Sequence, residues 1–498
     1  MGAARTDFAL TGKHHVHAIT INVLSDDILL EIFDVCQKNR DLGLRLAGLP
    51  ESVWDWHILA HVCQRWRRAV FASPLRLDLR IFCTHGTPVR KDLYIWPTFP
   101  IHVEYLFREN IEGIDEDNVI AALEHPDRVS AVGLYRVTGP QLGKMIPVMQ
   151  EPFPALAHLF LLADISNDIP ILPSEFLGGS APRLQTIELV GIPFPTLPAL
   201  LLSTSDLVIL ILSNIPQTGY ISPEAMVVAL ATLTRLEDLR FIFRSPASRP
   251  DRIRLPPTTR TVLPTLTSLY FHGVREYLED FVAQIYTPRL DFICIEYFNQ
   301  LVDFEIPQLW QFIDHSGSED LSRIMRCVVE FHDDSVSFGA GTTTNTPESE
   351  SFEVFPRCMD VNILGKGVDW QVSHLAQALN QISTVLSNIL HFAIGCTSII
   401  LEPDEMDDIE WLELLRPFSS VQTLFVSKEF AGHISRSLEA IATVIATEVL
   451  PALDVLCLEG EPPSSVHKFI AARSESGRPV TAVDTKREFE ERLMSYLN

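Results

Sequence analysis

The sequence is poor in charged residues and in cysteine for its length, and each shortage excludes a class of protein. Only 21% of the 498 residues are charged, whereas 47% are hydrophobic. A disordered polymer would contain fewer hydrophobic residues, so we expect a folded chain. The eight cysteines are scattered and form no C-x-x-C pair. They therefore do not indicate a disulfide framework, and they favour a reducing compartment, the cytoplasm or the nucleus.

Long hydrophobic runs are also missing. No stretch reaches the roughly 18 uninterrupted apolar residues that a membrane-spanning helix needs. The best candidate, residues 386–401, is interrupted by five polar residues. The first 17 residues contain no apolar core of the kind found in signal peptides. We therefore expect no contact with a membrane.

Known catalytic motifs are absent as well. The sequence contains no G-x-S-x-G, no H-E-x-x-H and no G-x-x-x-x-G-K-S/T. His14, His15 and His17 form a small cluster that is better explained as part of a polar tail. The acidic run 402–410 lacks the alternating ligands and the glycine of a calcium loop, and is interpreted as a solvated loop. We predict no catalytic residue, no metal site and no cofactor.

Charge of one sign dominates, but unevenly. The formal net charge is −25. Residues 1–90 hold 11 basic and 9 acidic residues, a net charge of +2, so the other 408 residues carry −27. Such an acidic chain repels a phosphate backbone, which argues against a general nucleic-acid-binding role. The chain is longer than one compact hydrophobic core usually accommodates, so several domains or an elongated repeat array are expected.

Two short amphipathic helices are predicted in the first ninety residues. The first begins at Ser25, a suitable N-cap, and Asp26 and Asp27 lie at the positive end of its dipole. The second spans about residues 56–72 and ends before Pro74. Helical spacing places apolar residues of each helix on one face: Ile28, Leu29, Ile32, Phe33 and Cys36 in the first, and Ile58, Leu59, Val62, Trp66 and Val70 in the second. A unit this small needs a further surface to pack on.

These helices carry a pattern that resembles the F-box. The matching residues are Leu24, Asp27, Ile28, Leu29, Glu31, Ile32 and Phe33, then Val62, Cys63, Arg65, Trp66 and Arg67. The run 65–79 (RWRRAVFASPLRLDL) is similar to F-box proteins of mushroom-forming fungi. Ser25 stands where the family usually has proline, and the linker between the two halves is longer than usual. The resemblance covers roughly residues 22–80.

The resemblance implies a role as the substrate-recognition subunit of an SCF-type cullin–RING ubiquitin ligase. An F-box binds the Skp-type adaptor, and the rest of the chain binds a protein substrate. Motif matching gives the candidate adaptor-binding residues Leu24, Ile28, Leu29, Ile32, Phe33, Val62 and Trp66. Trp66 could equally belong to the interface or hold the helices together. Two alternatives stay open: an interaction scaffold whose F-box does not engage the ligase, and an unrecognised α/β enzyme.

Beyond residue 100, short strands of the form L-x-x-L-x-L recur. Their first positions, from Val129 through Leu156, Leu184, Leu207, Leu236 and Leu266 to Leu290, lie 23 to 30 residues apart. This spacing is close to that of leucine-rich repeats, in which one strand per unit stacks into a curved sheet. The usual asparagine ladder is largely missing. The expected fold is α/β, a small helical F-box followed by an irregular leucine-rich-repeat-like solenoid; a plain α/β layered domain is the alternative.

The predicted organisation has five parts. They are a tail (1–21), the F-box module (22–90), the solenoid (91–332), an exposed loop insertion (333–368), and a continuation of the solenoid that ends in a closing helix (369–498). Within the last part we expect a long helix over 369–392, a strand at 397–401, further strands near 421–426 and 453–458, and a closing helix over 485–497. The strands are expected to be buried on both faces.

Substrate binding is expected on the strand-lined side of the repeat domain. The x positions of L-x-x-L-x-L point outward there, and exposed aromatic side chains often anchor interfaces. The candidate substrate-binding residues are Phe160, Glu188, Arg240, Tyr270 and Tyr297. Because the repeat domain is acidic, the expected partner presents a basic surface.

Overall fold

The structure is a computed structural model of the 498-residue chain. It describes residues 24–35, 55–73, 80–84, 89–96, 99–107, 116–164, 168–247, 259–298, 305–316, 324–342, 357–382, 386–396, 408–444, 449–459 and 464–484. The predicted tail, the strand at 397–401 and the closing helix over 485–497 lie outside these ranges.

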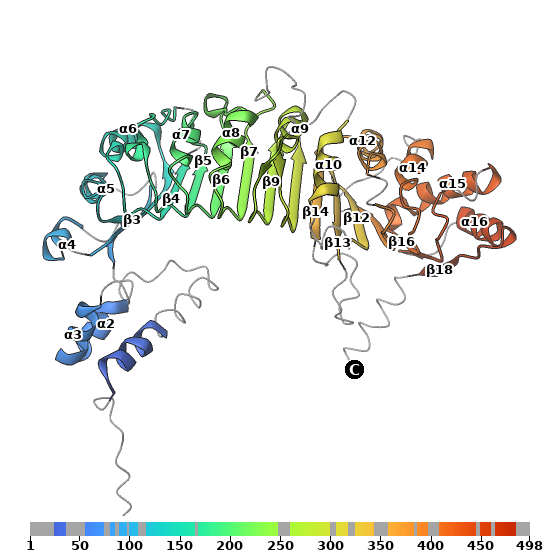
Figure 1. The fold of residues 1–498 in the computed structure, drawn as a ribbon. Helices are drawn as coiled ribbons and strands as arrows, with labels where there is room; N and C mark the ends of the chain where they lie inside the picture. Colours follow the sequence, from blue (N-terminus) through green and yellow to red (C-terminus); the bar gives the residue numbers. More distant parts are fainter. Residues whose placement is uncertain are drawn as a thin grey trace, which may run out of the picture.

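The described residues form a mixed α/β fold around one large sheet (Figure 1). Its sixteen strands follow the order β1-β2-β3-β4-β5-β6-β7-β9-β11-β14-β13-β12-β15-β16-β17-β18. All pairs in it are parallel except the two made by β13. The strands of the first half are β1 Ile81–Cys83, β2 Ile101–Leu106, β3 Val129–Val137, β4 His158–Ala163, β5 Thr186–Val190, β6 Ile209–Ile215, β7 Asp238–Phe243, β9 Ser268–Gly273 and β11 Phe292–Tyr297. Those of the second half are β12 Arg326–Phe331, β13 Ser335–Gly341, β14 Arg357–Leu364, β15 His391–Cys396, β16 Thr423–Val426, β17 Val455–Leu458 and β18 Thr481–Asp484.

Helices follow one another along one side of this curved sheet (Figure 1). Those that accompany the sheet are α4 Val89–Ile95, α5 Glu116–Leu123, α6 Gly139–Met145, α7 Leu197–Leu201, α8 Pro223–Leu230, α9 Arg275–Val282, α10 Pro307–His315, α12 Val368–Asn380, α14 Asp408–Leu415, α15 Lys428–Val444 and α16 Ser464–Glu475. Shorter elements complete the connections: η2 Ile146–Gln150, η3 Phe176–Gly179, η4 Gln217–Gly219, and the strand pair β8 Thr261–Val262 and β10 Ile285–Tyr286. Within the described ranges, no helix has the length and apolar character that crossing a membrane requires.

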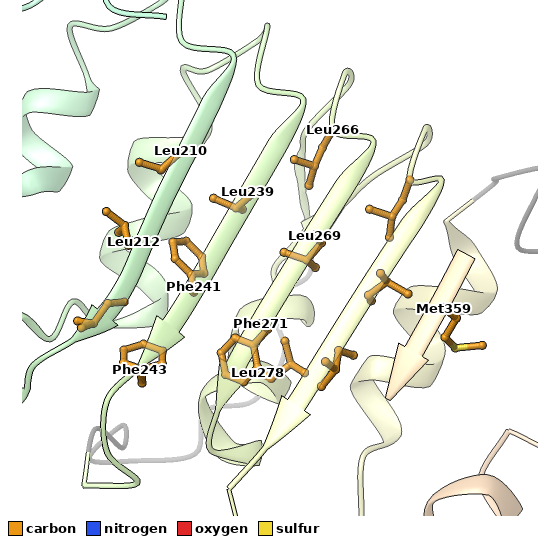
Figure 2. Close-up of a cluster of buried hydrophobic side chains, with 14 of the residues drawn as sticks. Leu210, Leu212, Leu239, Phe241, Phe243, Leu266, Leu269, Phe271, Leu278 and Met359 are labelled. Atoms are coloured by element: carbon orange, nitrogen blue, oxygen red, sulfur yellow. The ribbon is translucent and has the colours of Figure 1, made fainter. Parts of the chain in front are cut away.

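The hydrophobic core lies between the helices and one face of the sheet. In β9 and β11, as in most strands, buried and half-buried residues alternate. Figure 2 shows leucine and phenylalanine side chains of β6, β7 and β9 in one continuous layer. The expectation that the strands are buried on both faces is wrong for most of them, because helices cover only one face and the other remains half-exposed; β13, with six of its seven residues buried, is the exception.

The prediction of an exposed loop over 333–368 is also wrong, because the structure describes two strands in this segment. Residues 335–341 form the antiparallel strand β13, and 357–364 form β14, which pairs with β11. β13 is buried at six of its seven positions, and β14 at four of its eight. Alternating apolar residues in 357–364 were a strand signal, but the Gly-, Ser- and Thr-rich sequence around them favoured a loop.

The long helix predicted over 369–392 is shorter in the structure. α12 ends at Asn380, and residues 391–396 form β15, which pairs with β12 and β16. Strands β16 and β17 lie where they are expected. The periodicity extends past Asn380 because Ile382, Leu386 and Ile389 also enter the core, although they lie outside α12.

The N-terminal helices form a small unit at the β1 end of the sheet (Figure 1). They comprise a helix over 26–35, α2 Asp55–Val62 and α3 Gln64–Ala72. Phe71 of α3 stacks on Trp96, which follows α4, with ring centroids 4.8 Å apart. Trp96 stacks in turn on Phe99 at 5.4 Å. These three rings join the helical unit to the sheet.

Candidate interaction surfaces

The N-terminal helices expose several large apolar side chains. Ile28 is 48% exposed, Ile32 37% and Val62 55%. Ile28 and Ile32 are four residues apart and therefore lie on the same face of their helix. Exposed apolar residues grouped in this way are typical of protein contact surfaces. We refer to Ile28, Ile32 and Val62 as the N-terminal apolar residues.

The other candidate adaptor-binding residues hold the helical unit together. Leu29 and Phe33 are buried, at 0% and 1% exposed. Trp66 is half-buried and packs on Phe33 with centroids 4.7 Å apart, and Leu24 is half-buried against the same core. Leu29 and Phe33 therefore support the surface and do not lie on it. The sequence could not separate the two roles, because all these positions carry large apolar side chains.

Polar contacts also fix the start of the first helix. The backbone N–H of Ile28 donates to Ser25 Oγ at 3.4 Å, so the serine caps the helix. Arg65 of α3 pairs with Asp26 at 2.8 Å and donates to the carbonyl of Leu24. Ser25 thus satisfies a backbone group at the helix start, and Arg65 joins this start to α3.

The half-exposed face of the sheet is the second candidate surface. Strand register places Phe160 beside Glu188, and Arg240 beside Tyr270, with Ile211 of β6 between the two pairs. Four of the five candidate substrate-binding residues therefore lie in one row across β4, β5, β7 and β9. None of the four is buried.

Tyr297 does not belong to this surface, and its assignment is corrected. Its side chain is 0% exposed, on the same side of β11 as Ile293 and Ile295. The two-residue period of a strand requires this orientation, since Tyr297 has the parity of the inward residues. Burial holds the pKa of the Tyr297 hydroxyl well above its usual range.

Charged side chains gather on this face from β7 onward. Arg240 makes a bidentate contact with Asp238, with its shortest N···O distance 2.6 Å. The hydroxyl of Tyr270 donates to Glu296 at 3.3 Å. His272 lies 3.9 Å from Glu296, and burial lowers the pKa of the imidazole, which favours its neutral form.

A charged group formed by β12 and β14 was not predicted from the sequence. Arg357 pairs with Asp360 at 3.2 Å and with Glu330 at 3.0 Å. Its side chain crosses β13 over Gly339, where an added Cβ would lie 2.9 Å from Arg357 Cδ. The alternation of Met359, Asp360 and Val361 is typical of a strand, but this segment was predicted to be a loop.

The chemistry of this face suits binding better than nucleophilic catalysis. Burial raises the pKa of the Cys294 thiol to about 12, so it lacks the thiolate of a reactive cysteine. The Tyr270 hydroxyl also has a pKa raised to about 12, mainly by burial. Burial likewise raises the pKa of the Glu188 and Asp360 carboxyls. Across the ranges that the structure describes, no group of three or more His, Cys, Asp and Glu residues could hold a metal ion.

In sequence comparisons, no protein-family model and no curated protein matched the chain.

Proposed function

We propose that the chain is a substrate-recruiting F-box subunit of an SCF-type cullin–RING ubiquitin ligase. In this proposal the N-terminal helices are the F-box, and the sheet with its helices is an irregular leucine-rich-repeat-like solenoid. The Skp-type adaptor binds the N-terminal apolar residues, and a protein substrate binds the half-exposed face of the sheet. The subunit recruits substrate, and ligation belongs to the assembled complex.

One observation carries the proposal. The motif residues divide into a buried pair, Leu29 and Phe33, and an exposed pair on the same helix, Ile28 and Ile32. Large apolar side chains that are grouped and exposed to water are typical of surfaces that bind a partner. Apolar residues on one helical face supply contact area for a partner.

The test is co-precipitation of a purified Skp-type adaptor with the full chain. Ile32→Asp should lower adaptor recovery at least about tenfold, because it buries a carboxylate in an apolar contact. Ile32 is already 37% exposed, so the free chain should remain folded. Val228→Asp is the matched control, since Val228 is 64% exposed on α8, away from the N-terminal helices.

Two results would contradict the proposal. One is equal adaptor recovery with Ile32→Asp and Val228→Asp. The other is no recovery with the unmodified chain, which would favour a scaffold that does not engage the ligase. Circular dichroism of both variants checks that the fold is retained.

A further inference from the structure

The half-exposed face of the sheet is divided into two chemically different parts. Its apolar half comprises Tyr135, Phe160, Leu162, Val190 and Ile211, from β3 to β6, all half-buried. The rings of Tyr135 and Phe160 lie 4.6 Å apart. Neighbouring strands pair in register, so these side chains form one continuous strip.

The acidic half begins at β7 and continues to β12. Four carboxylates and three guanidiniums lie there: Asp238, Glu296, Glu330 and Asp360, with Arg240, Arg326 and Arg357. Arg240 pairs with Asp238, and Arg357 pairs with both Glu330 and Asp360. The acidic half therefore carries a net charge of about −1 at neutral pH.

Two carboxylates of the face are not neutralised by these contacts. Among the described interactions, Glu296 is close to the Tyr270 hydroxyl and to His272, and neither carries a full positive charge at neutral pH. Glu188 lies within the apolar half, between Phe160 of β4 and Ile211 of β6, and makes no direct ion pair in the described part of the chain. Its pKa is raised by burial, and Arg240 offsets this only in part. Four strand spacings, about 19 Å, separate Glu188 on β5 from Glu296 on β11, so each carboxylate would attract a cation of its own in a partly dehydrated site.

We propose that this face binds a protein segment that is apolar at one end and rich in Lys and Arg at the other. The segment lies across the strands, with its apolar end over β3–β6 and its cationic end over β7–β12. Nine strand spacings separate β3 from β12, about 43 Å at about 4.8 Å each. About twelve to thirteen residues of extended chain cover that distance. The proposal deepens the proposed function, since it specifies the substrate segment, but the binding itself requires no adaptor.

The charge of the face determines the class of partner. A nucleic acid would be repelled by its uncompensated carboxylates, and an acidic segment equally so. A wholly basic segment would leave the apolar half uncovered. A second copy of the chain would have to supply cationic side chains from a strongly acidic molecule, and it would reveal itself as a concentration-dependent dimer.

The probes for the test are fluorescent twelve-residue peptides added to the full chain without adaptor. The first contains six alternating Leu and Ser residues followed by six alternating Arg and Ser residues, and a second has the two blocks in the opposite order. Two further peptides replace either all Arg by Glu or all Leu by Ser. At least one of the first two should bind, and its affinity should fall as the salt concentration rises. Each replacement should weaken binding at least about tenfold.

Variants of the chain locate the binding site. Glu188→Gln with Glu296→Gln should weaken binding of the better probe about tenfold. The control is Glu151→Gln with Glu475→Gln, which removes the same charge from exposed positions outside this face and should change affinity less than about twofold. A photoreactive group at the apolar end of the probe should crosslink to β3–β6, and one at the cationic end to β7–β12.

The proposal is overturned if neither mixed probe binds or if the Glu-containing probe binds equally well. Equal binding of the Leu-free probe would overturn the role of the apolar half. Equal effects of the two double variants would place the site elsewhere. Because adaptor is absent from this assay, its failure leaves the Ile32→Asp co-precipitation unaffected, and the two proposals fail separately.

Discussion

At the scale of single residues, Glu279 shows how a buried carboxylate can be structural. It belongs to α9 and accepts hydrogen bonds from the backbone N–H groups of Gln308 at 2.8 Å and Leu309 at 2.9 Å. These groups lie in the first turn of α10, where no intrahelical partner exists. Burial nevertheless raises the pKa of the Glu279 carboxyl to about 7, and the two hydrogen bonds oppose that rise only in part.

This pKa predicts that stability falls as pH rises. Below about pH 4.5 Glu279 is protonated in both folded and unfolded chains, so it contributes no pH dependence. Between about pH 4.5 and pH 7 the folded chain keeps a proton that the unfolded chain releases, so the free energy of unfolding falls. Above pH 7 the loss, at most about 3 kcal/mol, is complete. Glu279→Gln should remove this loss while retaining an acceptor for α10.

Urea unfolding at pH 5 and pH 8 measures the effect. The change in urea midpoint from pH 5 to pH 8 should be more negative for the unmodified chain than for Glu279→Gln. Glu475→Gln, at an exposed position in α16, is the control and should leave the difference unchanged. An identical pH difference in all three proteins would contradict the assignment.

At the scale of secondary-structure elements, the attachment of α3 to the sheet depends on aromatic packing. Phe71, Trp96 and Phe99 stack in series. Arg128, which precedes β3, donates to the backbone carbonyls of Trp96 at 2.7 Å and Phe99 at 2.9 Å. The segment after α4 is therefore held from both sides, by α3 and by the sheet.

Phe71→Ala should weaken this attachment without unfolding the sheet. Removing a half-buried phenylalanine from an aromatic stack should cost about 2 kcal/mol. Hydrogen exchange should become faster in α3 and in the helix over 26–35, and it should stay unchanged in β9. Tyr94→Ala is the control, because Tyr94 is 89% exposed on α4. Faster exchange in both variants, or in neither, would show that the stack does not hold the helices.

At the scale of the whole molecule, each strand is stabilised mainly by its neighbours along the sheet. One hydrophobic cluster includes buried residues from Leu29 to Val480, yet each inner strand of the large sheet pairs with only two neighbours. In such an arrangement a local defect is felt most strongly by adjacent units. A defect at the centre should therefore affect more of the molecule than one of equal size near an end.

Two leucine truncations test this expectation. Leu239 in β7 and Leu456 in β17 are 0% and 1% exposed, so each change to alanine should cost about 2 to 5 kcal/mol locally. Leu239→Ala should speed hydrogen exchange in strands on both sides of β7. Leu456→Ala should speed exchange in β15–β18 and leave β3–β6 unchanged. Equal effects of the two variants on β3–β6 would indicate one fully cooperative unit.

The sequence by itself determined the α/β class, the strands β3 to β7, β9 and β11, and the outward positions of Phe160, Glu188, Arg240 and Tyr270. Two-residue alternation and recurring leucines are local patterns, and they fix which face of a strand is apolar. The same parity rule, applied consistently, would have placed Tyr297 in the core.

Only the tertiary structure decided how distant segments combine. The antiparallel strand β13, between β14 and β12, brings Arg357 to Glu330, and no local pattern encodes a pairing between segments so far apart. The tertiary structure also separated Leu29 and Phe33, which are buried, from Ile28 and Ile32, which remain in contact with water. Burial depends on what packs against a side chain, and helical spacing alone does not specify that neighbour.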